Sequence, residues 1–521
     1  MNETQAPLAS RRPSIRGVNL TLLIAIVLFL SLGSLMQLVS LLWGTIGAEI
    51  CTMLLPVSVY ILIKNLPYAE SIRWRWPGWK LLLVAAVLGA GMMVLTANWG
   101  LVVSEWITYD LPLSPELFPR TISDSLVLLL ALSVTAPISE EILFRGFFQQ
   151  AHEHSGALRA IVLSTLLFAG FHMSMLRFII LLPVSFMFAY VAWRTRSVLV
   201  TIVMHSVYNG ISAVSTILST HSAELLNQEI EPSMIPWVIS SLVIAAGLYA
   251  LHRWSTPPDE PLEAPRRSLL GRSWPLVPVV LLLIGAMGVE LVMGLRPDLL
   301  ATRPLVVTNS QATGSWTYDL QGPADSALGS AAVQVTNSDE LLHIAVGQQI
   351  TGELPVSTTA PLWINQQTEY GADANSLTSL NSSLQLEGTA YDAELSWNDT
   401  RVSWEVSGGA SAEAEMSQPL LVAGEWPWRM SALDFGVLAT WKVTLAKPVQ
   451  DENGAVVYAF EDTLLRVRGA EPVAVPAGIY VAWRVTVGDA TAWYDSEAPH
   501  TLVRYEENGV IWQLSEATGE K

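Results

Sequence analysis

The chain divides into two parts with different patterns of hydrophobic and polar residues. Residues 1–300 contain long apolar runs with few charges, each long enough to cross a hydrocarbon core of roughly 30 Å. Residues 303–521 contain no such run and show short stretches in which apolar and polar residues alternate. The pattern predicts a polytopic α-helical membrane protein followed by a soluble all-β C-terminal domain, with the boundary near Arg303.

The apolar runs predict about nine transmembrane helices. Their expected ranges are 18–41, 46–64, 80–103, 122–152, 157–173, 177–193, 197–219, 235–252 and 274–295. The fourth run is longer than one plain crossing needs. The first two runs can also be read as one re-entrant pair, which would move the tail to the other side of the membrane.

Basic residues gather in alternate loops, as the positive-inside rule requires of cytoplasmic segments. If the N-terminus is cytoplasmic, the inner segments hold Arg11, Arg12, Arg16, Lys64, Arg73, Arg75, Lys80, Arg159, Arg194, Arg196, Arg253, Arg266, Arg267 and Arg272. The outer loops carry acidic residues such as Glu105, Asp110 and Glu224. We therefore expect a multi-pass protein of the cell (plasma) membrane, with a cytoplasmic N-terminus and an extracytoplasmic C-terminal domain.

The net charge of −18 lies entirely in the C-terminal part. The first 302 residues hold 18 Lys+Arg and 18 Asp+Glu, which leaves 10 and 28 for the rest of the chain. So acidic a domain disfavours nucleic acid or an anionic membrane surface as its partner. Cys51 is the only cysteine, so the tail must be held together by core packing rather than by disulfides.

The tail has the period-two pattern of half-buried strands at 342–346, 402–406, 441–445 and 480–487. Asn453-Gly454 and Asn508-Gly509 predict tight hairpin turns in which both central residues have positive φ. The tryptophans are expected in the core; they include Trp316, Trp404, Trp441, Trp483, Trp493 and Trp512. The tail shows no metal-ligating or nucleophilic pattern, which favours a binding module with an extracytoplasmic partner.

Three short motifs place ionisable and amide side chains inside apolar runs. EEILFR contains Glu140, Glu141 and Arg145, FAGFH contains Phe168 and His172, and HSVYN contains His205 and Asn209. Ionisable groups at such depth are costly and usually serve function. The spacing of four in the last two motifs puts both side chains on one helix face, so three helices can aim these groups into one cavity.

These residue types suit hydrolysis without a covalent intermediate. A carboxylate can take a proton from water, and imidazole and amide groups can hold the oxyanion that forms on the attacked carbonyl. One carboxylate and two imidazoles, here Glu140, His172 and His205, are also a ligand set for Zn²⁺ with an open water position. The sequence leaves both readings open. Helix rise puts Glu140 roughly 22 Å from the inner boundary, in a cavity expected to open toward the cytoplasm.

The motifs EExxxR, FxxxH and HxxxN resemble those of the CPBP family of intramembrane proteases, also called the Abi or type II CAAX prenyl protease family. The resemblance covers residues 75–255. It implies that Glu140 activates water with Glu141 and Arg145 as partners, that His172 orients the water, and that His205 and Asn209 form the oxyanion hole. Members are often labelled metalloproteases, whereas the eukaryotic prenyl proteases resemble metal-independent glutamate enzymes.

Two functions follow from this resemblance. The first is an intramembrane endopeptidase that cuts membrane-associated or lipid-modified proteins. The second is a non-catalytic relative that acts as a bacteriocin-immunity or membrane scaffold protein, with a partner bound by its tail. Replacement of Glu140 separates the two.

Overall fold

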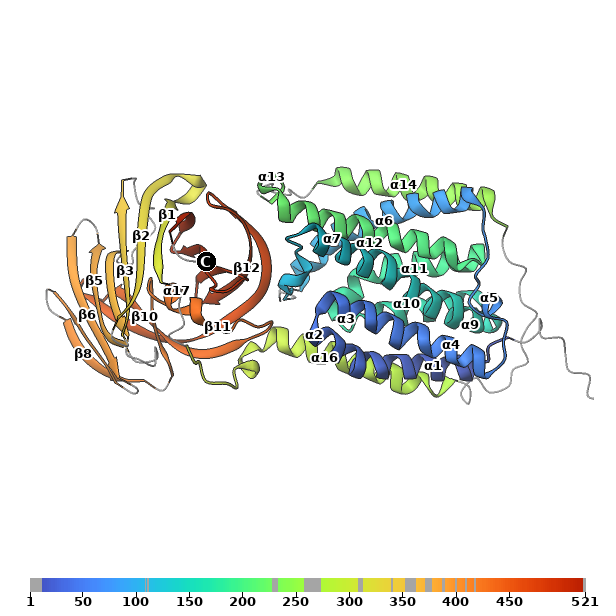
Figure 1. Cartoon of the computed structure of the whole chain (residues 1–521), viewed down its shortest axis with the longest axis horizontal. Helices are drawn as coiled ribbons and strands as arrows, with labels where there is room; N and C mark the ends of the chain where they lie inside the picture. Colours follow the sequence, from blue (N-terminus) through green and yellow to red (C-terminus); the bar gives the residue numbers. More distant parts are fainter. Residues whose placement is uncertain are drawn as a thin grey trace, which may run out of the picture. The chain divides into compact units, whose positions relative to one another are not determined.

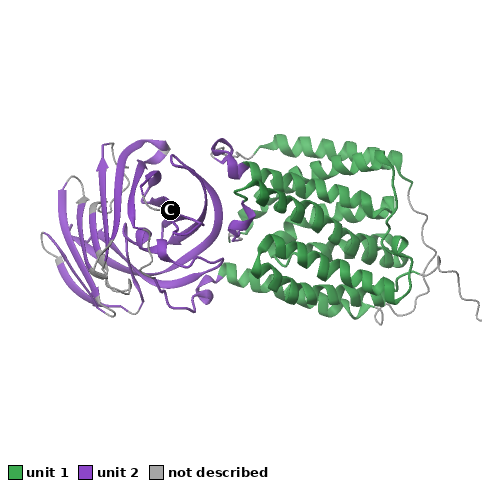
Figure 2. Cartoon of the chain, viewed as in Figure 1, with its two compact units in different colours: residues 1–109, 119–218, 229–295 green, residues 110–118, 219–228, 296–521 purple. Residues whose placement is uncertain are grey.

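The chain forms two compact units (Figure 2). The computed structural model describes residues 12–107, 109, 112–226, 233–256, 273–307, 313–338, 341–351, 362–370, 377–386, 389–398, 401–407, 410–416 and 418–518. Unit 1 comprises residues 1–109, 119–218 and 229–295, and unit 2 comprises 110–118, 219–228 and 296–521. After α16, the chain passes from unit 1 to unit 2 at residue 296.

Unit 1 is a bundle of apolar helices (Figure 1). Its helical segments are α1 (Ile15–Leu28), η2 (Phe29–Gly33), α2 (Ser34–Val39), α3 (Leu41–Ala48), η3 (Glu49–Leu54), α4 (Leu55–Ile63), α5 (Tyr68–Ser71), α6 (Trp79–Trp106), α7 (Ile122–Leu129), η5 (Leu130–Thr135), α8 (Ala136–Glu141), η6 (Ile142–Gln149), α9 (Gln150–His152), η7 (Glu153–Ser155), α10 (Ala157–Phe171), α11 (Met175–Thr195), α12 (Val198–His221), α14 (Met234–Trp254) and α16 (Leu276–Leu295). Among the described residues, eight continuous helical stretches are long and apolar enough to cross a membrane. The helical membrane region predicted from the sequence is confirmed.

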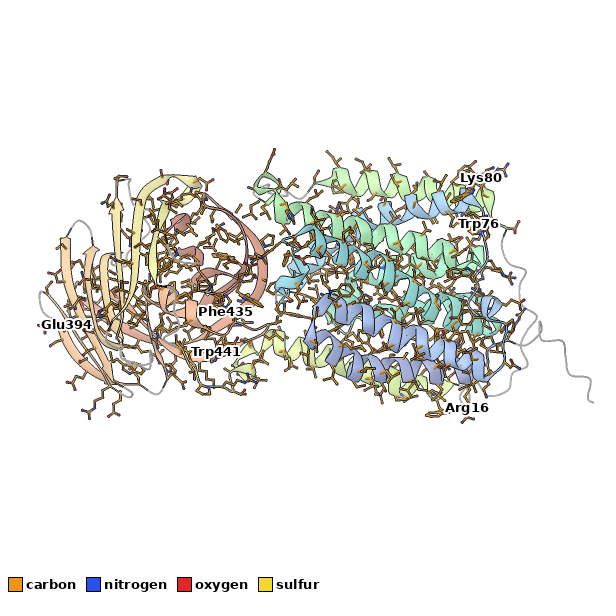
Figure 3. The ribbon with its side chains drawn as sticks, in the orientation of Figure 1. Arg16, Trp76, Lys80, Glu394, Phe435 and Trp441 are labelled. Atoms are coloured by element: carbon orange, nitrogen blue, oxygen red, sulfur yellow. The ribbon has the colours of Figure 1, made fainter. Side chains whose placement is uncertain are left out.

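Polar contacts mark one end of the bundle. Arg73 Nη1 donates to Glu153 Oε1 at 2.8 Å, and Val198 N donates to the Arg73 carbonyl at 3.0 Å. Figure 3 shows Arg16 and Lys80 at this same end of the helical unit. Basic residues that the sequence analysis assigned to different inner loops therefore lie at the same end of the helical unit.

The opposite end of the bundle is marked by Glu290 of α16. Its carboxylate accepts hydrogen bonds from Tyr109, which follows α6, and from Ser174, which precedes α11. Helix α10 connects the Glu153 end to the Ser174 end, although its 15 residues span only about 22 Å. It is thus a shorter apolar helix beside the eight candidate spans in the described part of the chain.

The long fourth helix, Ile122–Ser155, is not a regular α-helix. It includes two π-helical segments, η5 and η6, which flank α8. Pro137 lies in the first turn of α8 and has no N–H to bond the carbonyl four residues earlier, so the regular pattern is interrupted there. π segments inside α-helices occur frequently at functional sites, and α8 carries Glu140 and Glu141.

Unit 2 is built on one curved sheet of 15 described strands in the order β8-β7-β6-β5-β4-β3-β2-β1-β15-β14-β13-β12-β11-β10-β9. The strands are β1 (Gly314–Gln321), β2 (Ala327–Ser338), β3 (Leu341–Ile350), β4 (Leu362–Tyr370), β5 (Leu377–Leu386), β6 (Thr389–Asn398), β7 (Arg401–Val406), β8 (Ala410–Glu415), β9 (Leu420–Val422), β10 (Thr440–Gln450), β11 (Val456–Val475), β12 (Gly478–Val487), β13 (Ala490–Asp495), β14 (Leu502–Glu507) and β15 (Val510–Ala517). Neighbouring strands are antiparallel except β9 and β10. The all-β prediction is confirmed, and the four alternating segments lie within β3, β7, β10 and β12.

The six tryptophans predicted to be buried are each less than 10% exposed. Five lie in the main core of unit 2, and Trp493 lies in a smaller cluster with Val473, Ala482 and Val503. Short helical segments complete the unit: η4 (Pro115–Leu117), α13 (Ala223–Leu226), η8 (Pro297–Leu300), η9 (Pro323–Asp325), α17 (Trp426–Arg429) and η10 (Met430–Ala432). Trp426 is fully buried against Tyr505, with ring centroids 6.0 Å apart. Aromatic packing thus takes the place of the disulfides that the sequence rules out.

The two predicted hairpin turns differ. Asn508 and Gly509 both have positive φ, as expected. At the other turn Gly454 has positive φ and Asn453 does not, so the prediction is wrong for Asn453. The carboxylate of Asp451 accepts hydrogen bonds from the N–H groups of Asn453 and Ala455 at 2.9 and 2.8 Å, which fixes a longer turn.

Unit 2 also includes residues 110–118, which link two membrane helices. Ala470 N donates to the carbonyl of Leu113 at 2.8 Å. The neighbouring Gly469 has φ +111°, and a Cβ there would meet Leu113 N at 2.6 Å. Only glycine meets both the conformational and the steric requirement, so this loop is anchored in the β-rich unit.

Candidate active site

A buried network joins the first and third motifs. Glu141 is fully buried, and its Oε1 accepts hydrogen bonds from Arg145 Nη1 and His205 Nδ1, each at 3.0 Å. Arg145 is also fully buried and lies one turn after Glu141, where η6 follows α8. Since the guanidinium keeps Glu141 ionised, the carboxylate acts as an acceptor and His205 carries its proton on Nδ1.

His205 also faces the second glutamate. Its Nε2 lies 3.8 Å from Oε2 of Glu140, which is 8% exposed. This separation is longer than a hydrogen bond. With Nδ1 bound to Glu141, the imidazole is fixed in orientation and its second nitrogen is directed at the carboxylate of Glu140.

Phe168 joins the second motif to this network. The Arg145 guanidinium lies over the Phe168 ring at 3.8 Å from its centroid, a geometry that favours a cation. The same ring makes edge contacts with His172 and His205, at centroid distances of 5.4 and 5.8 Å. Phe168 therefore separates the two imidazoles and packs against both.

His172 ends helix α10. It is the C-cap residue, and its Nδ1 lies 3.1 Å from the carbonyl of Phe168. The structure thus places His172 beside the network, without a direct hydrogen bond to either glutamate among the described contacts.

Asn209 lies one turn after His205 on α12. Its Nδ2 donates to the carbonyl of Leu132 at 2.8 Å, within the π segment η5 that precedes the glutamates. The sequence assigned this amide to an oxyanion hole. In the structure its donor ties α12 to the helix that carries Glu140.

Glu49 is a further carboxylate that the sequence analysis missed. It lies in η3, which packs against α8, the segment that carries Glu140, and it is 4% exposed. Its Oε2 has no hydrogen-bond partner among the described residues. Glu49 could have been found from the sequence, because it is an ionisable residue inside the apolar run 46–64. The sequence analysis considered only the carboxylates of the three motifs.

The ligand set proposed for zinc does not gather. Within the described ranges, no three His, Cys, Asp or Glu residues are arranged to hold a metal ion. Nδ1 of His205 is engaged by Glu141, and Nδ1 of His172 faces the Phe168 carbonyl, so only the Nε2 atoms of the two rings could bind a metal. In the described part of the chain, Glu140, His172 and His205 do not form a three-ligand group.

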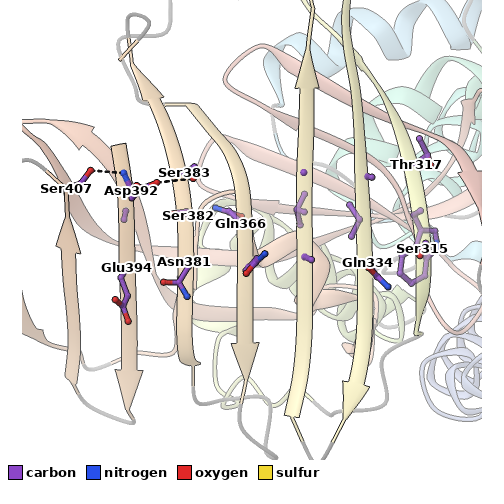
Figure 4. Close-up of a pocket in the computed structure, with 18 of the residues that line it drawn as sticks. Ser315, Thr317, Gln334, Gln366, Asn381, Ser382, Ser383, Asp392, Glu394 and Ser407 are labelled. Atoms are coloured by element: carbon purple, nitrogen blue, oxygen red, sulfur yellow. Dashed lines mark hydrogen bonds between the residues drawn. The ribbon is translucent and has the colours of Figure 1, made fainter. Parts of the chain in front are cut away.

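Unit 2 has a polar trough on its sheet (Figure 4). It has a volume of about 920 Å³ and runs across strands β1 to β7. Small residues such as Ala332, Ala345 and Gly347 form part of its lining, and Glu394 faces Glu405 on the neighbouring strand. None of the three catalytic motifs contributes to it.

Comparisons with known proteins bear on the two units separately. The family model described as type II CAAX prenyl endopeptidase Rce1-like matches residues 122–211. No curated protein sequence matches the chain. A crystal structure of a β-barrel-like protein of a domain of unknown function from Brucella abortus is similar at 10% identity and a TM-score of 0.28, over 40% of this chain and 98% of that one. A likeness at this score does not define the fold of unit 2.

The matched residues 122–211 contain all six site residues expected from the motifs: Glu140, Glu141, Arg145, His172, His205 and Asn209. The resemblance recognised from those motifs is therefore confirmed over this segment. Over residues 122–211, the chain is therefore similar to the Rce1-like, type II CAAX prenyl endopeptidase family.

Proposed function

We propose that the protein is an intramembrane endopeptidase that hydrolyses a peptide bond of a membrane-associated or lipid-modified substrate. The membrane family and its three motifs support this reading. The observation that carries it is the position of His205, whose two ring nitrogens face Glu141 at 3.0 Å and Glu140 at 3.8 Å. Two carboxylates with one imidazole between them, buried among apolar helices, form an acid–base group rather than a packing contact.

The two glutamates have different roles in this proposal. Glu141 pairs with Arg145, which keeps it ionised, and orients His205 through Nδ1. Glu140 accepts no hydrogen bond from the described residues, so its carboxylate is free to act on water. This separates a positioning carboxylate from a catalytic one.

The reaction then proceeds in two steps. Glu140 takes a proton from water as the water oxygen bonds to the substrate carbonyl carbon, which leaves an oxyanion. His172 orients the water. His205 stabilises the oxyanion as an imidazolium, which carries a second proton on Nε2 while Nδ1 stays bound to Glu141. Asn209 contributes the amide N–H that it does not donate to Leu132. The oxyanion collapses, the C–N bond breaks, and Glu140 returns its proton to the departing amine.

Location and partners are part of the proposal. The basic loop residues gathered at the Arg16 end favour a cytoplasmic position for that end. The N-terminus is then cytoplasmic and the β-rich unit extracytoplasmic, in a multi-pass protein of the plasma membrane that is surrounded by lipid. The trough of unit 2 is a candidate surface for an extracytoplasmic partner. The predicted opening of the active site toward the cytoplasm stays a prediction.

The experiment compares membrane peptides from cells that express the wild type, Glu140→Gln or Glu105→Gln. Glu105 is an exposed carboxylate at the end of α6 and serves as the matched control. We expect cleavage products to disappear in Glu140→Gln alone. Unchanged products in Glu140→Gln would favour the non-catalytic alternative, an immunity or scaffold protein.

A further inference from the structure

Helix α16 carries a single carboxylate, Glu290, that collects three hydrogen bonds. Tyr109 Oη donates to Oε2 at 2.6 Å, Ser174 Oγ donates to Oε1 at 2.9 Å, and Met175 N donates to Oε2 at 3.2 Å. The donors come from the segment after α6 and from the turn between α10 and α11. One side chain therefore ties together three parts of the helical unit.

The turn held by Glu290 begins at His172. His172 caps α10, Met173 has φ +53°, and Ser174 caps α11 by accepting a hydrogen bond from Arg177 N at 3.2 Å. A non-glycine residue with positive φ is uncommon and persists where its surroundings hold it. The Glu290 carboxylate restrains this turn by accepting hydrogen bonds from the Ser174 hydroxyl and from the backbone N–H of Met175, the first residue of α11. A negative charge is also favoured at the N-terminus of a helix.

The position of Glu290 is itself fixed by packing. The Tyr109 ring lies so close to Gly294 that a Cβ there would be 2.5 Å from it. About two turns before Glu290, Leu283 of α16 is buried and lies close to Gly170, where a Cβ would meet the Leu283 Cδ1 at 3.3 Å. Helix α16 therefore packs closely on the end of α10 that carries His172.

The hydroxyl of Tyr109 stays a donor in this arrangement. Burial and the neighbouring Glu290 carboxylate raise the pKa of Tyr109 above its usual value. The phenol therefore remains protonated throughout the neutral range, and its short hydrogen bond to Glu290 persists.

We infer that Glu290 is a positioning residue for His172. Helix α16 then contributes to the proposed active site, although it lies outside the matched segment 122–211. This inference rests on the proposed function, because it assigns His172 its role in orienting water. Helix α16 ends at Leu295, one residue before the chain continues into unit 2. The helix that leads to the β-rich unit is thus the helix that holds the His172 turn.

The first arm of the test measures cleavage. Glu290→Ala removes all three hydrogen bonds, and Glu290→Gln keeps the shape and one acceptor oxygen. We expect kcat to fall about 10²-fold in Glu290→Ala, because a displacement of about 1 Å in a catalytic group costs that much, and less in Glu290→Gln. KM should change little. Val289→Ala, at an exposed position of the same helix, should leave both constants unchanged.

The second arm does not depend on activity. Cys51 is the only cysteine, so Met173→Cys in a Cys51→Ser background reports on the turn through its rate of thiol labelling. We expect labelling to accelerate several-fold when Glu290→Ala is added and to stay constant with Val289→Ala. Because this arm needs no substrate, it still tests the hold on the turn if the wild type cleaves nothing.

The outcomes distinguish the positioning role of Glu290 from the proposed protease function. Faster labelling with a lower kcat supports the inference. Faster labelling with unchanged kcat would overturn it, because the turn would then be held for stability alone. Unchanged labelling in both Glu290 variants would also overturn it, whatever their activity. Absence of cleavage by the wild type would count against the proposed function and leave the labelling result to decide the positioning.

Discussion

Nδ1 of His205 lies 3.0 Å from Oε1 of Glu141, a residue 64 positions earlier in the chain. The contact joins α12 to the fourth membrane helix and fixes which nitrogen of the imidazole faces Glu140. The same Oε1 also accepts from Arg145 at 3.0 Å. Glu141 is therefore the centre of the network, and Glu140 is the group that the network leaves available for chemistry.

Glu141→Gln should destabilise the protein strongly. The change removes the negative charge between Arg145 and His205, both almost completely buried. Breaking a buried ion pair by removing one partner costs about 3–5 kcal/mol. Thermal unfolding of the purified protein in detergent measures the loss, with the exposed Glu105→Gln as control. An unfolding temperature equal to that of the control would show that Glu141 does not hold the network.

Glu49→Gln should make the protein more stable and less active. An ionisable group at 4% exposure with an oxygen that lacks a hydrogen-bond partner costs about 1–3 kcal/mol. A neutral amide lowers that cost, while the carboxyl group beside Glu140 is lost. The check is to measure unfolding temperature and kcat on the same preparation. Full activity in Glu49→Gln would mean that the carboxylate has no part in the reaction.

Gly469→Ala should destabilise unit 2. The φ of +111° and the Leu113 backbone 2.6 Å from the new Cβ both oppose a side chain, and strain of this kind costs about 1–3 kcal/mol. Gly436→Ala is the matched control, because a Cβ there meets nothing within 4 Å. Unfolding followed by tryptophan fluorescence reports on the unit, whose core is rich in tryptophan. Equal midpoints for the two variants would refute the close packing of the loop.

Chelation should leave cleavage unchanged. In the described ranges, no three His, Cys, Asp or Glu side chains converge to hold a metal ion. The assay is peptide cleavage after treatment with a zinc chelator, followed by addition of Zn²⁺. Loss of activity that Zn²⁺ restores would contradict the metal-independent mechanism.

Much of the architecture follows from local pattern. Runs of apolar residues predict the membrane helices because the bilayer sets their length, and alternation predicts the strands because one face of the sheet is buried. Helix α10 is the instructive case. Its 15 residues fall short of a full span, yet contacts at Glu153 and Ser174 show that it connects the two ends of the bundle.

The three sequence motifs predict only part of the candidate site. Spacing brings His205 and Asn209 to one helix face, but no spacing shows that Asn209 bonds Leu132 rather than a substrate. The π segments around Glu140 depend on tertiary packing and on Pro137. Glu49 and Glu290 join the site region from helices distant in sequence, so only the folded bundle shows what they contact. Asn453 departs from its predicted φ because the nearby Asp451 side chain binds the turn.

The most direct test of the central claim is cleavage of a membrane-anchored reporter peptide by purified wild type and Glu140→Gln in the same lipid vesicles. Glu141 still pairs with Arg145 and His205 in this variant, so the fold should be retained and the unfolding temperature should stay close to that of the wild type. The account predicts that kcat falls by at least about 10²-fold, the usual contribution of a general base. Cleavage at the wild-type rate by a folded Glu140→Gln protein would contradict it.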